Sequence, residues 1–267
     1  MTHLCFKSDV FILLYIVVYG IVSLGGAIMK KTRELNTKES VKVVTSNSFI
    51  TACGLEDLSL KGRKLLYLAI SQCRKTDTEF FEYSISVKSF ADMMDIQANN
   101  VYSIMESTTD ELMRTFIKYK DKNNTRKYSL FSLCEYNDTT VRFKLNPDMT
   151  EFLLELKGNF SQPLLAEFVR MRSPYSISIW HLMQREMKSQ KPYADHIIEF
   201  DLSLEELREI TGTEKKLKKL SDFKIRVLDK ALKEIDENCN VVIKYENVKQ
   251  GRKVIGFHFI AKSKWYR

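Results

Sequence analysis

One short sequence pattern occurs in each half of this chain, and it constrains the fold more than any other feature. Residues 85–93 read Ile-Ser-Val-x-x-Phe-x-x-Met, and residues 202–210 read Leu-Ser-Leu-x-x-Leu-x-x-Ile. In each copy the serine is a typical helix N-cap, and apolar residues follow at helical spacing. The pattern predicts that a strand delivers a serine to the start of a short amphipathic helix in both halves.

The expected elements around the two copies follow the same order. A helix over residues 59–73, capped by Ser59, precedes a strand over 80–87, and a helix over 173–188 precedes a strand over 197–202. The longer helices and hairpin strands are expected over residues 99–116, 127–136 and 140–145 in the first half and 221–238, 241–245 and 254–260 in the second. The matching order indicates an internal duplication.

Helix, strand, short helix, long helix and hairpin is the order of a winged-helix domain. The sequence therefore predicts an α+β fold of two winged-helix domains in tandem, and 267 residues are enough for two hydrophobic cores. A helix expected over residues 149–157 is interrupted by glycine and proline within 158–163, which indicates a boundary near residue 160. The expected domains are residues 41–160 and 161–267, after an extension of residues 1–40.

The extension contains an unbroken apolar run over residues 10–28, which is long enough to cross a bilayer. Three interpretations compete: a membrane anchor, a signal peptide with small residues at 25–27, and a mis-assigned start codon upstream of Met29. The polar, lysine-rich sequence after Met29 is typical of a cytoplasmic start. We therefore expect a mis-assigned start, with residues 30–40 disordered.

The net charge of +8 and a pI of about 9.1 favour a polyanionic partner, either nucleic acid or an acidic membrane surface. The five cysteines form no CxxC pair, and the four histidines are dispersed. This usage indicates a reducing, cytoplasmic compartment and argues against a zinc site. We expect no metal and no cofactor.

A DNA-binding winged helix needs basic residues at the start of its long helix and at its wing. The second half meets this demand with a lysine-rich cluster before and within the helix, whose apolar stripe leaves the cluster, Lys224 included, free to face outward. The candidate DNA contacts there are Lys218, Lys219, Ser221, Lys224 and Arg226 on the helix side and Lys249, Arg252 and Lys253 at the hairpin tip. A solvated lysine-rich helix face is the alternative for the helix cluster taken alone.

The matching segment of the first half is polar and not basic. Asn99, Asn100 and Ser103 are candidates for contact with bases or phosphates, although asparagine pairs are also common helix caps. Arg126 and Lys127, expected at the first wing, are better candidates for phosphate contact.

Enzymatic alternatives lack their motifs. The chain has no GxxxxGK[ST] loop, no His-x-His pair beside a nucleophilic tyrosine and no recognisable acidic metal pair, so we expect no catalytic site. Tyr102, Tyr175 and Trp180 lie at helical core spacing and are expected to pack in the core and not to stack on bases.

Five segments resemble the iteron-binding plasmid replication initiators. They occur in the order of that family, at residues 43–52, 155–160, 173–177, 223–231 and 251–253. The resemblance implies two winged-helix domains that bind direct repeats at a replication origin as a monomer. It also implies dimers, formed through the first domain, that repress the initiator's own gene, and recruitment of a host initiator and the replicative helicase.

Two departures from that family pattern stand out. The segment before Met29 has no counterpart, and Ser178 stands where the family usually has a basic residue, which puts a contact there in doubt. Two alternative functions stay open: a winged-helix transcriptional repressor without origin function, and a membrane-anchored basic protein if residues 1–28 are translated.

Overall fold

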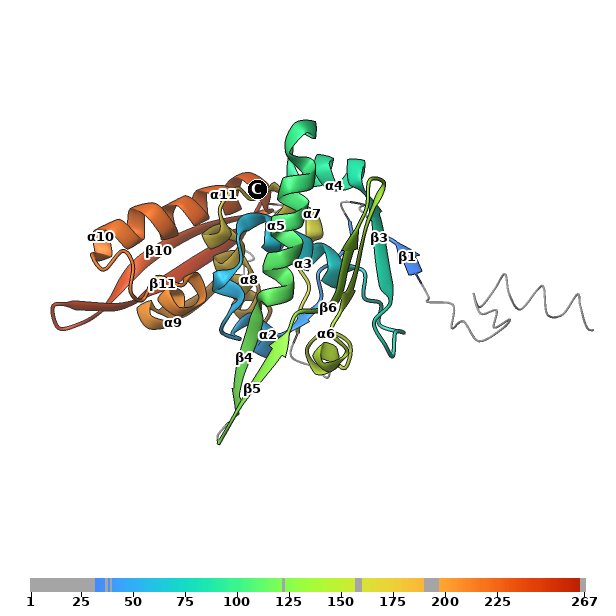
Figure 1. Cartoon of the computed structure of the whole chain (residues 1–267). Coiled ribbons are helices and arrows are strands. Elements are labelled where there is room, and N and C mark those ends of the chain that lie inside the picture. The colour runs from blue at the N-terminus through green and yellow to red at the C-terminus, as the bar shows by residue number, and fades with distance from the viewer. Residues whose placement is uncertain are drawn as a thin grey trace, which may run out of the picture.

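The computed structural model describes residues 32–36, 38, 40–121, 123–156, 160–189 and 197–264. These residues form two α+β units, each with helices packed on a small sheet (Figure 1). The apolar run at residues 10–28 lies outside the described residues. Within the part that is described, no helix is long and apolar enough to span a membrane.

The first unit contains most of the helices and strands. Its elements are β1 (Thr32–Glu34), β2 (Thr45–Ser46), α2 (Asn47–Ile50), η1 (Leu55–Asp57), α3 (Leu60–Ser71), β3 (Glu82–Ser86), α4 (Val87–Met94), η2 (Ala98–Asn100), α5 (Val101–Arg114), β4 (Phe116–Asp121), β5 (Asn124–Ser129), β6 (Phe131–Tyr136), β7 (Thr140–Leu145), η3 (Pro147–Met149), α6 (Thr150–Leu153), β8 (Phe160–Ser161) and α7 (Leu165–Arg170). Its main sheet has the strand order β1-β3-β7-β6, and β2 pairs with β8.

The second unit repeats the same plan with fewer elements. Its elements are α8 (Pro174–Ser189), β9 (Ile197–Ser203), α9 (Leu204–Thr211), α10 (Leu220–Phe223), η5 (Lys224–Asp229), α11 (Lys230–Asn238), β10 (Val241–Gln250) and β11 (Lys253–Ser263). The segments α10, η5 and α11 follow one another without a break as one long helix whose middle, η5, is π-helical.

The two sheets have the same topology. In the second unit the last strand, β11, lies between β9 and β10, and in the first unit the last strand, β7, lies between β3 and β6. All four of these pairings are antiparallel. The tandem winged-helix fold and its internal duplication are thereby confirmed.

Serine caps start the helices where the sequence predicts them. The Oγ of Ser86 accepts the N–H of Ser89 at 3.0 Å, and the Oγ of Ser203 accepts the N–H of Glu206 at the same distance. Ser59 caps α3 in the same way. These caps satisfy backbone donors that the first helical turn leaves without partners.

One hairpin of the first unit was not predicted. The expected helix to residue 116 ends at Arg114, and the expected single strand over 127–136 is two strands of different sheets. Residues 116–129 form β4 and β5, a separate two-stranded sheet that projects from the body of the unit (Figure 1). The fully buried Leu130 stands where the chain passes from β5 into β6. The wing of this unit is therefore β6–β7, and β4–β5 is inserted before it.

Three further predictions need smaller corrections. Residues 32–34 lie in the segment expected to be disordered, but they form β1, which pairs in parallel with β3. The strand expected within residues 41–52 is only the two residues of β2, because the Ser46 Oγ accepts the N–H of Phe49 and starts α2. The helix expected over residues 149–157 ends at Leu153.

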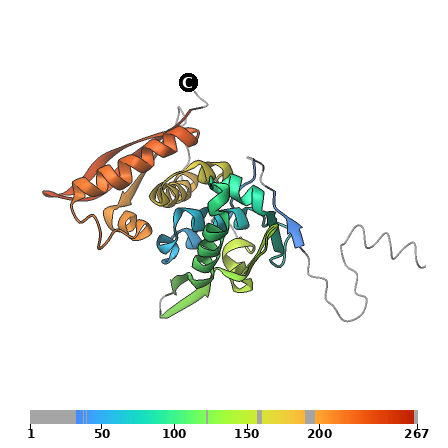
Figure 2. The same ribbon diagram turned by 45° about the horizontal axis from the view of Figure 1, so that its top comes forward.

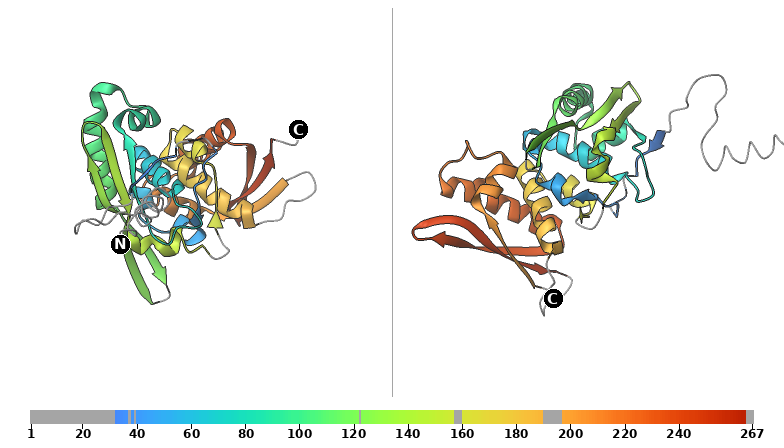
Figure 3. Two further views of the ribbon diagram at one scale, coloured as in Figure 1. Left: turned by 90° about the vertical axis from the view of Figure 1, so that its right-hand side faces the viewer. Right: turned by 90° about the horizontal axis from the view of Figure 1, so that it is seen from below.

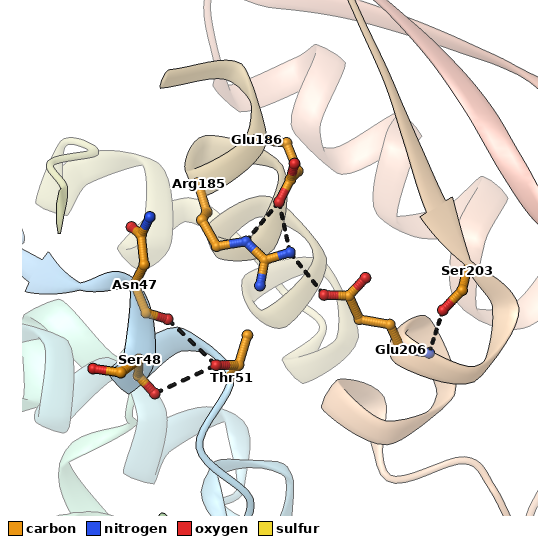
Figure 4. Close-up of polar contacts among 7 residues, drawn as sticks. All are labelled: Asn47, Ser48, Thr51, Arg185, Glu186, Ser203 and Glu206. Atoms are coloured by element: carbon orange, nitrogen blue, oxygen red, sulfur yellow. Dashed lines mark hydrogen bonds and ion pairs between the residues drawn. The ribbon is translucent and has the colours of Figure 1, made fainter. Parts of the chain in front are cut away.

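Helix α8 connects the two units. It packs against α2, α3 and β8 on one side and against α9 and α11 on the other (Figures 2 and 3). Arg185 of α8 donates to Glu206 of α9 at 2.7 Å and to its neighbour Glu186, as Figure 4 shows. The carboxylate of Glu234 on α11 accepts the backbone N–H groups of Arg172 and Ser173 just before α8.

A buried polar cluster lies where α8 meets the first unit. His181 is 1% exposed, and its Nδ1 lies 2.9 Å from the Tyr67 hydroxyl. Its Nε2 lies 2.9 Å from the Thr45 hydroxyl and 3.1 Å from that of Ser161. Burial lowers the pKa of His181 to about 3, so the ring is neutral near pH 7. The cluster thus joins α3, β2, β8 and α8 through one neutral ring.

Candidate nucleic-acid interface

The second unit presents a helix-turn-helix formed by α9 and the long helix. Helix α9 ends at Gly212, whose φ of +61° is left-handed and suits a residue without a Cβ. Residues 213–219 then form the turn, and α10 begins at Leu220. The sequence predicts the start of the long helix at residue 221, one residue later than observed.

The turn is held by Arg208, which the sequence reasoning missed. Its Nη1 donates to the carbonyls of Thr213 at 3.0 Å and Lys216 at 3.3 Å, and its Nη2 donates to those of Leu217 and Lys218 at 3.1 and 3.4 Å. The guanidinium also lies 4.8 Å from the ring centroid of Phe223. In the sequence, the feature that could indicate this role is an arginine four residues before the glycine that follows the helix.

The lysines of this turn point to solvent. The turn also exposes the acidic Glu214, and the exposed candidates for DNA contact in and after it are Lys215, Lys216, Lys218, Lys219, Ser221 and Arg226. Phe223, Val227 and Leu228 are fully buried on the opposite side of the long helix. The apolar stripe thus leaves most of the basic cluster free, as the sequence predicts.

Lys224 differs from this expectation because it is half-buried. Its Nζ donates to Asn247 Oδ1 at 3.2 Å and lies 5.1 Å from the ring centroid of Tyr245, both on β10. A cation is attracted to the face of an aromatic ring, so the ammonium turns toward the hairpin. The expectation that it faces freely outward is wrong, and its contact with DNA stays a prediction.

The hairpin tip carries the other basic group of the second unit. Gln250 pairs with Lys253, so Gly251 and Arg252 form a two-residue turn. Gly251 has a φ of +60° at the first turn position, a conformation that favours glycine. Lys249, Arg252 and Lys253 are all exposed there. The hairpin of β10 and β11 is the wing of the second unit, and it projects from the body of that unit (Figure 1).

A histidine on the sheet of this unit has a raised pKa. His258 on β11 lies opposite Asp201 on β9, and its Nδ1 is 2.7 Å from Asp201 Oδ1. This hydrogen bond is the largest cause that raises the pKa of His258, because it favours the protonated ring. The carboxylate of Glu199, at 3.5 Å from Nε2, acts in the same direction.

The long helix of a winged-helix domain is its recognition helix, which lies in the major groove of DNA. In the first unit this helix is α5, and its exposed surface carries both neutral polar and acidic side chains. Asn99, Asn100 and Ser103 are exposed at its start, but Glu106 and Asp110 follow on the exposed side. Tyr102, expected in the core, is 48% exposed, and its hydroxyl donates to the carbonyl of Asp138 at 3.3 Å. Tyr102 therefore connects α5 to the turn of the wing. Trp180 is buried, as expected.

Arg126 and Lys127 lie on β5 and not on the wing. The correction follows from the inserted hairpin, which takes up the residues that the sequence assigned to the wing. Their exposed cationic neighbours on β4 are Lys118 and Lys120. Arg126 forms a long ion pair of 3.9 Å with Glu151 while its side chain stays 52% exposed.

Ser178 is held by a buried arginine from another helix. Arg63 of α3 is 3% exposed and donates to the Ser178 hydroxyl and to the carbonyls of Leu58 and Pro174.

Among the described residues, no group of three histidine, cysteine or acidic side chains is arranged to hold a metal ion.

Both halves of the chain match known protein families. Residues 42–184 match the family described as initiator replication protein, WH1, and residues 203–261 match the family described as initiator Rep protein, WH2. The chain belongs to the initiator replication protein family. The first match covers the first unit from residue 42 and extends into the shared helix α8, and the second match covers the second unit from the end of β9 to β11.

A solved structure shares the fold of the initiator. The Pi initiator protein, crystallised in complex with iteron DNA, matches with a TM-score of 0.70 at 18% identity, over 85% of this chain and 99% of that chain. Domains 2 and 3 of RctB match with a TM-score of 0.47 at 11% identity, over 79% of this chain and 82% of that chain.

Proposed function

We propose that this initiator binds directly repeated sites at a plasmid replication origin, and that the second winged helix supplies the main contacts. The observation that carries the proposal is the placement of two exposed basic groups on one unit. One is the turn before the recognition helix, with Lys218 and Lys219, and the other is the wing tip, with Arg252 and Lys253. A winged helix places these two regions against the major groove and the flanking phosphates.

The Pi initiator protein supports the kind of DNA that we propose. Its structure was determined with iteron DNA, and it shares the tandem winged-helix fold of this chain. At 18% identity, the similarity extends to the fold, while the bases that are read depend on individual side chains.

The remaining parts of the proposal concern assembly. The first unit forms a domain for dimerisation and secondary DNA contact, and the second unit forms the main DNA-binding domain. The monomer binds the repeats, the dimer represses the initiator's own gene, and the bound monomers recruit a host initiator and the replicative helicase. The protein acts in the cytoplasm by binding and without catalysis.

A replication assay tests the proposal and separates it from a simple repressor. A plasmid whose only origin is the DNA beside this gene should replicate when the protein is supplied from a second, compatible plasmid. The double substitution Lys218→Ala and Lys219→Ala should abolish replication, because it removes two cations at the start of the recognition helix. Replacing the exposed Arg74 and Lys75 with alanine is the matched control and should leave it intact.

Two results contradict the proposal. Replication that does not depend on the supplied protein removes the initiator function. Repression of the gene without any support of replication favours the winged-helix repressor.

A further inference from the structure

One apolar side chain on the recognition helix of the second unit is largely exposed to solvent. Ile225 is 66% exposed, more than any other large apolar residue in the part of the chain that the structure describes. The side chains of Phe223, Val227 and Leu228 around it are fully buried. Ile225 therefore lies on the side of the helix that faces away from the core.

The segment that carries Ile225 is fixed at both ends. Ile225 belongs to the π-helical turn η5, which begins at Lys224 and ends at Asp229. Lys224 donates to Asn247, and Asp229 accepts the hydroxyl of Tyr245 at 2.7 Å, so both ends are tied to β10. Single π-helical turns within α-helices often occur at functional sites. The backbone around Ile225 is thus set before any ligand binds.

The neighbours of Ile225 on the exposed side are suited to DNA. Ser221 lies one turn before it, and Arg226 follows it directly; both are exposed. A hydroxyl and a guanidinium can bond to base edges or phosphates, but an isoleucine side chain cannot. The major groove offers one apolar group to such a side chain, the C5-methyl group of thymine.

We propose that Ile225 contacts the C5-methyl group of a thymine in the repeat and thereby helps to select the sequence. This inference rests on the proposed function, because it assigns a base to the recognition helix of the same interface. The contact buries apolar surface of both partners. Removing one methyl group from such a contact weakens binding about fourfold, from about 0.8 kcal/mol for each buried carbon group.

Uracil substitution tests the contact directly, because uracil lacks only the C5-methyl group. The full chain is titrated with synthetic duplexes of the repeat in which single thymines are replaced by uracil. With the wild-type protein, one or two positions should weaken binding about fourfold each. Ile225→Ala should bind the unmodified repeat more weakly by a similar factor and lose the response to uracil at those positions.

The controls separate folding from recognition. Ile225 is exposed, so the alanine variant should unfold at the same temperature as the wild type. Leu164→Ala, a change at another exposed apolar residue, should keep the full response to uracil. Equal responses of the wild type and Ile225→Ala at every thymine overturn this inference alone. Binding no tighter than to scrambled DNA overturns the proposed function and this inference with it.

Discussion

The turn between the two helices of the second helix-turn-helix depends on a single side chain. Arg208 donates to four backbone carbonyls within residues 213–218. These carbonyls lie in the irregular turn between α9 and α10, where that of Thr213 also accepts the N–H of Lys216 at 3.2 Å. The position of Lys218 and Lys219 therefore depends on Arg208, although Arg208 itself points into the turn.

Arg208→Ala should destabilise the protein by about 1–3 kcal/mol, because the carbonyls lose their charged donor. It should also weaken binding to the DNA repeats. Urea unfolding measures the first effect and fluorescence anisotropy the second. Arg114→Ala is the control, since the side chain of Arg114 is 79% exposed and pairs with Asp110 on the surface of α5. That change should stay within about 0.5 kcal/mol. Equal stability of the Arg208 variant and the wild type would contradict the role of Arg208.

His258 gives the second unit a pH dependence with a defined sign. Its pKa is raised above 6.5 by Asp201, so the folded protein binds the proton more tightly than the unfolded chain does. The stabilisation is complete below about pH 6.5 and is lost as the pH rises through the raised pKa. The difference in unfolding free energy between wild type and His258→Gln should therefore shrink as the pH rises from about 6.5 through the raised pKa of His258. A difference that grows with pH would contradict this assignment.

At the scale of single residues, the sequence predicts the buried stripe of the long helix but not the side chains that contact a hairpin. The stripe of Phe223, Val227 and Leu228 follows from helical spacing alone. The side chains of Lys224 and Tyr102 were predicted wrongly because each contacts a hairpin that is close in space and distant in sequence. The contacts of Arg208 depend on the path of an irregular turn, which spacing does not give.

Among the elements, the inserted hairpin β4–β5 extends the basic surface of the first unit. Its exposed cations are Lys118, Lys120, Arg126 and Lys127, whereas the exposed side of α5 includes Glu106 and Asp110. Charge therefore favours the hairpin over α5 as the part of the first unit that approaches phosphates.

Replacing Lys118, Arg126 and Lys127 with alanine should lower affinity for the repeats. It should also reduce the slope of log affinity against log salt by about 0.9 for each lost phosphate contact. The matched control replaces Arg74, Lys75 and Lys88, three exposed cations elsewhere on the same unit. Isothermal titrations at several salt concentrations measure both slopes. Equal effects of the two triple variants would show that only net charge matters.

Elements bounded by local signals were predicted well. Ser86 and Ser203 each cap a helix at the predicted residue. The hairpin β4–β5 was missed because residues 116–136 contain no glycine or proline to mark the breaks at residues 115 and 130. The chain there leaves one sheet and enters another without a turn signal.

Across the whole molecule, the two units share helix α8 and a continuous core. The His181 cluster lies on the side of α8 that faces the first unit, where one neutral ring serves three hydroxyl groups. A change there affects the packing of α8, and thus the support of both units.

His181→Leu should destabilise the protein by about 1–3 kcal/mol for each buried hydroxyl that it leaves without a partner. In the wild type, stability should fall as the pH drops below 6.5, because the unfolded chain binds a proton that the buried ring, with a pKa of about 3, does not. Thermal unfolding at two pH values, compared with Tyr67→Phe, measures both effects. A leucine variant as stable as the wild type would contradict the role of the cluster.

The duplicated fold could be predicted from sequence because two copies of one pattern occur within the same element order. The DNA-binding surface could be predicted only in part, since it depends on which basic residues the helices and hairpins expose.

The most direct test of binding to direct repeats is a gel-shift titration of the protein on the DNA beside its gene, with scrambled competitor at two salt concentrations. We expect stepwise complexes, one for each direct repeat, that resist the competitor and weaken steeply with salt. A single diffuse shift, removed equally by scrambled DNA, would contradict binding to direct repeats.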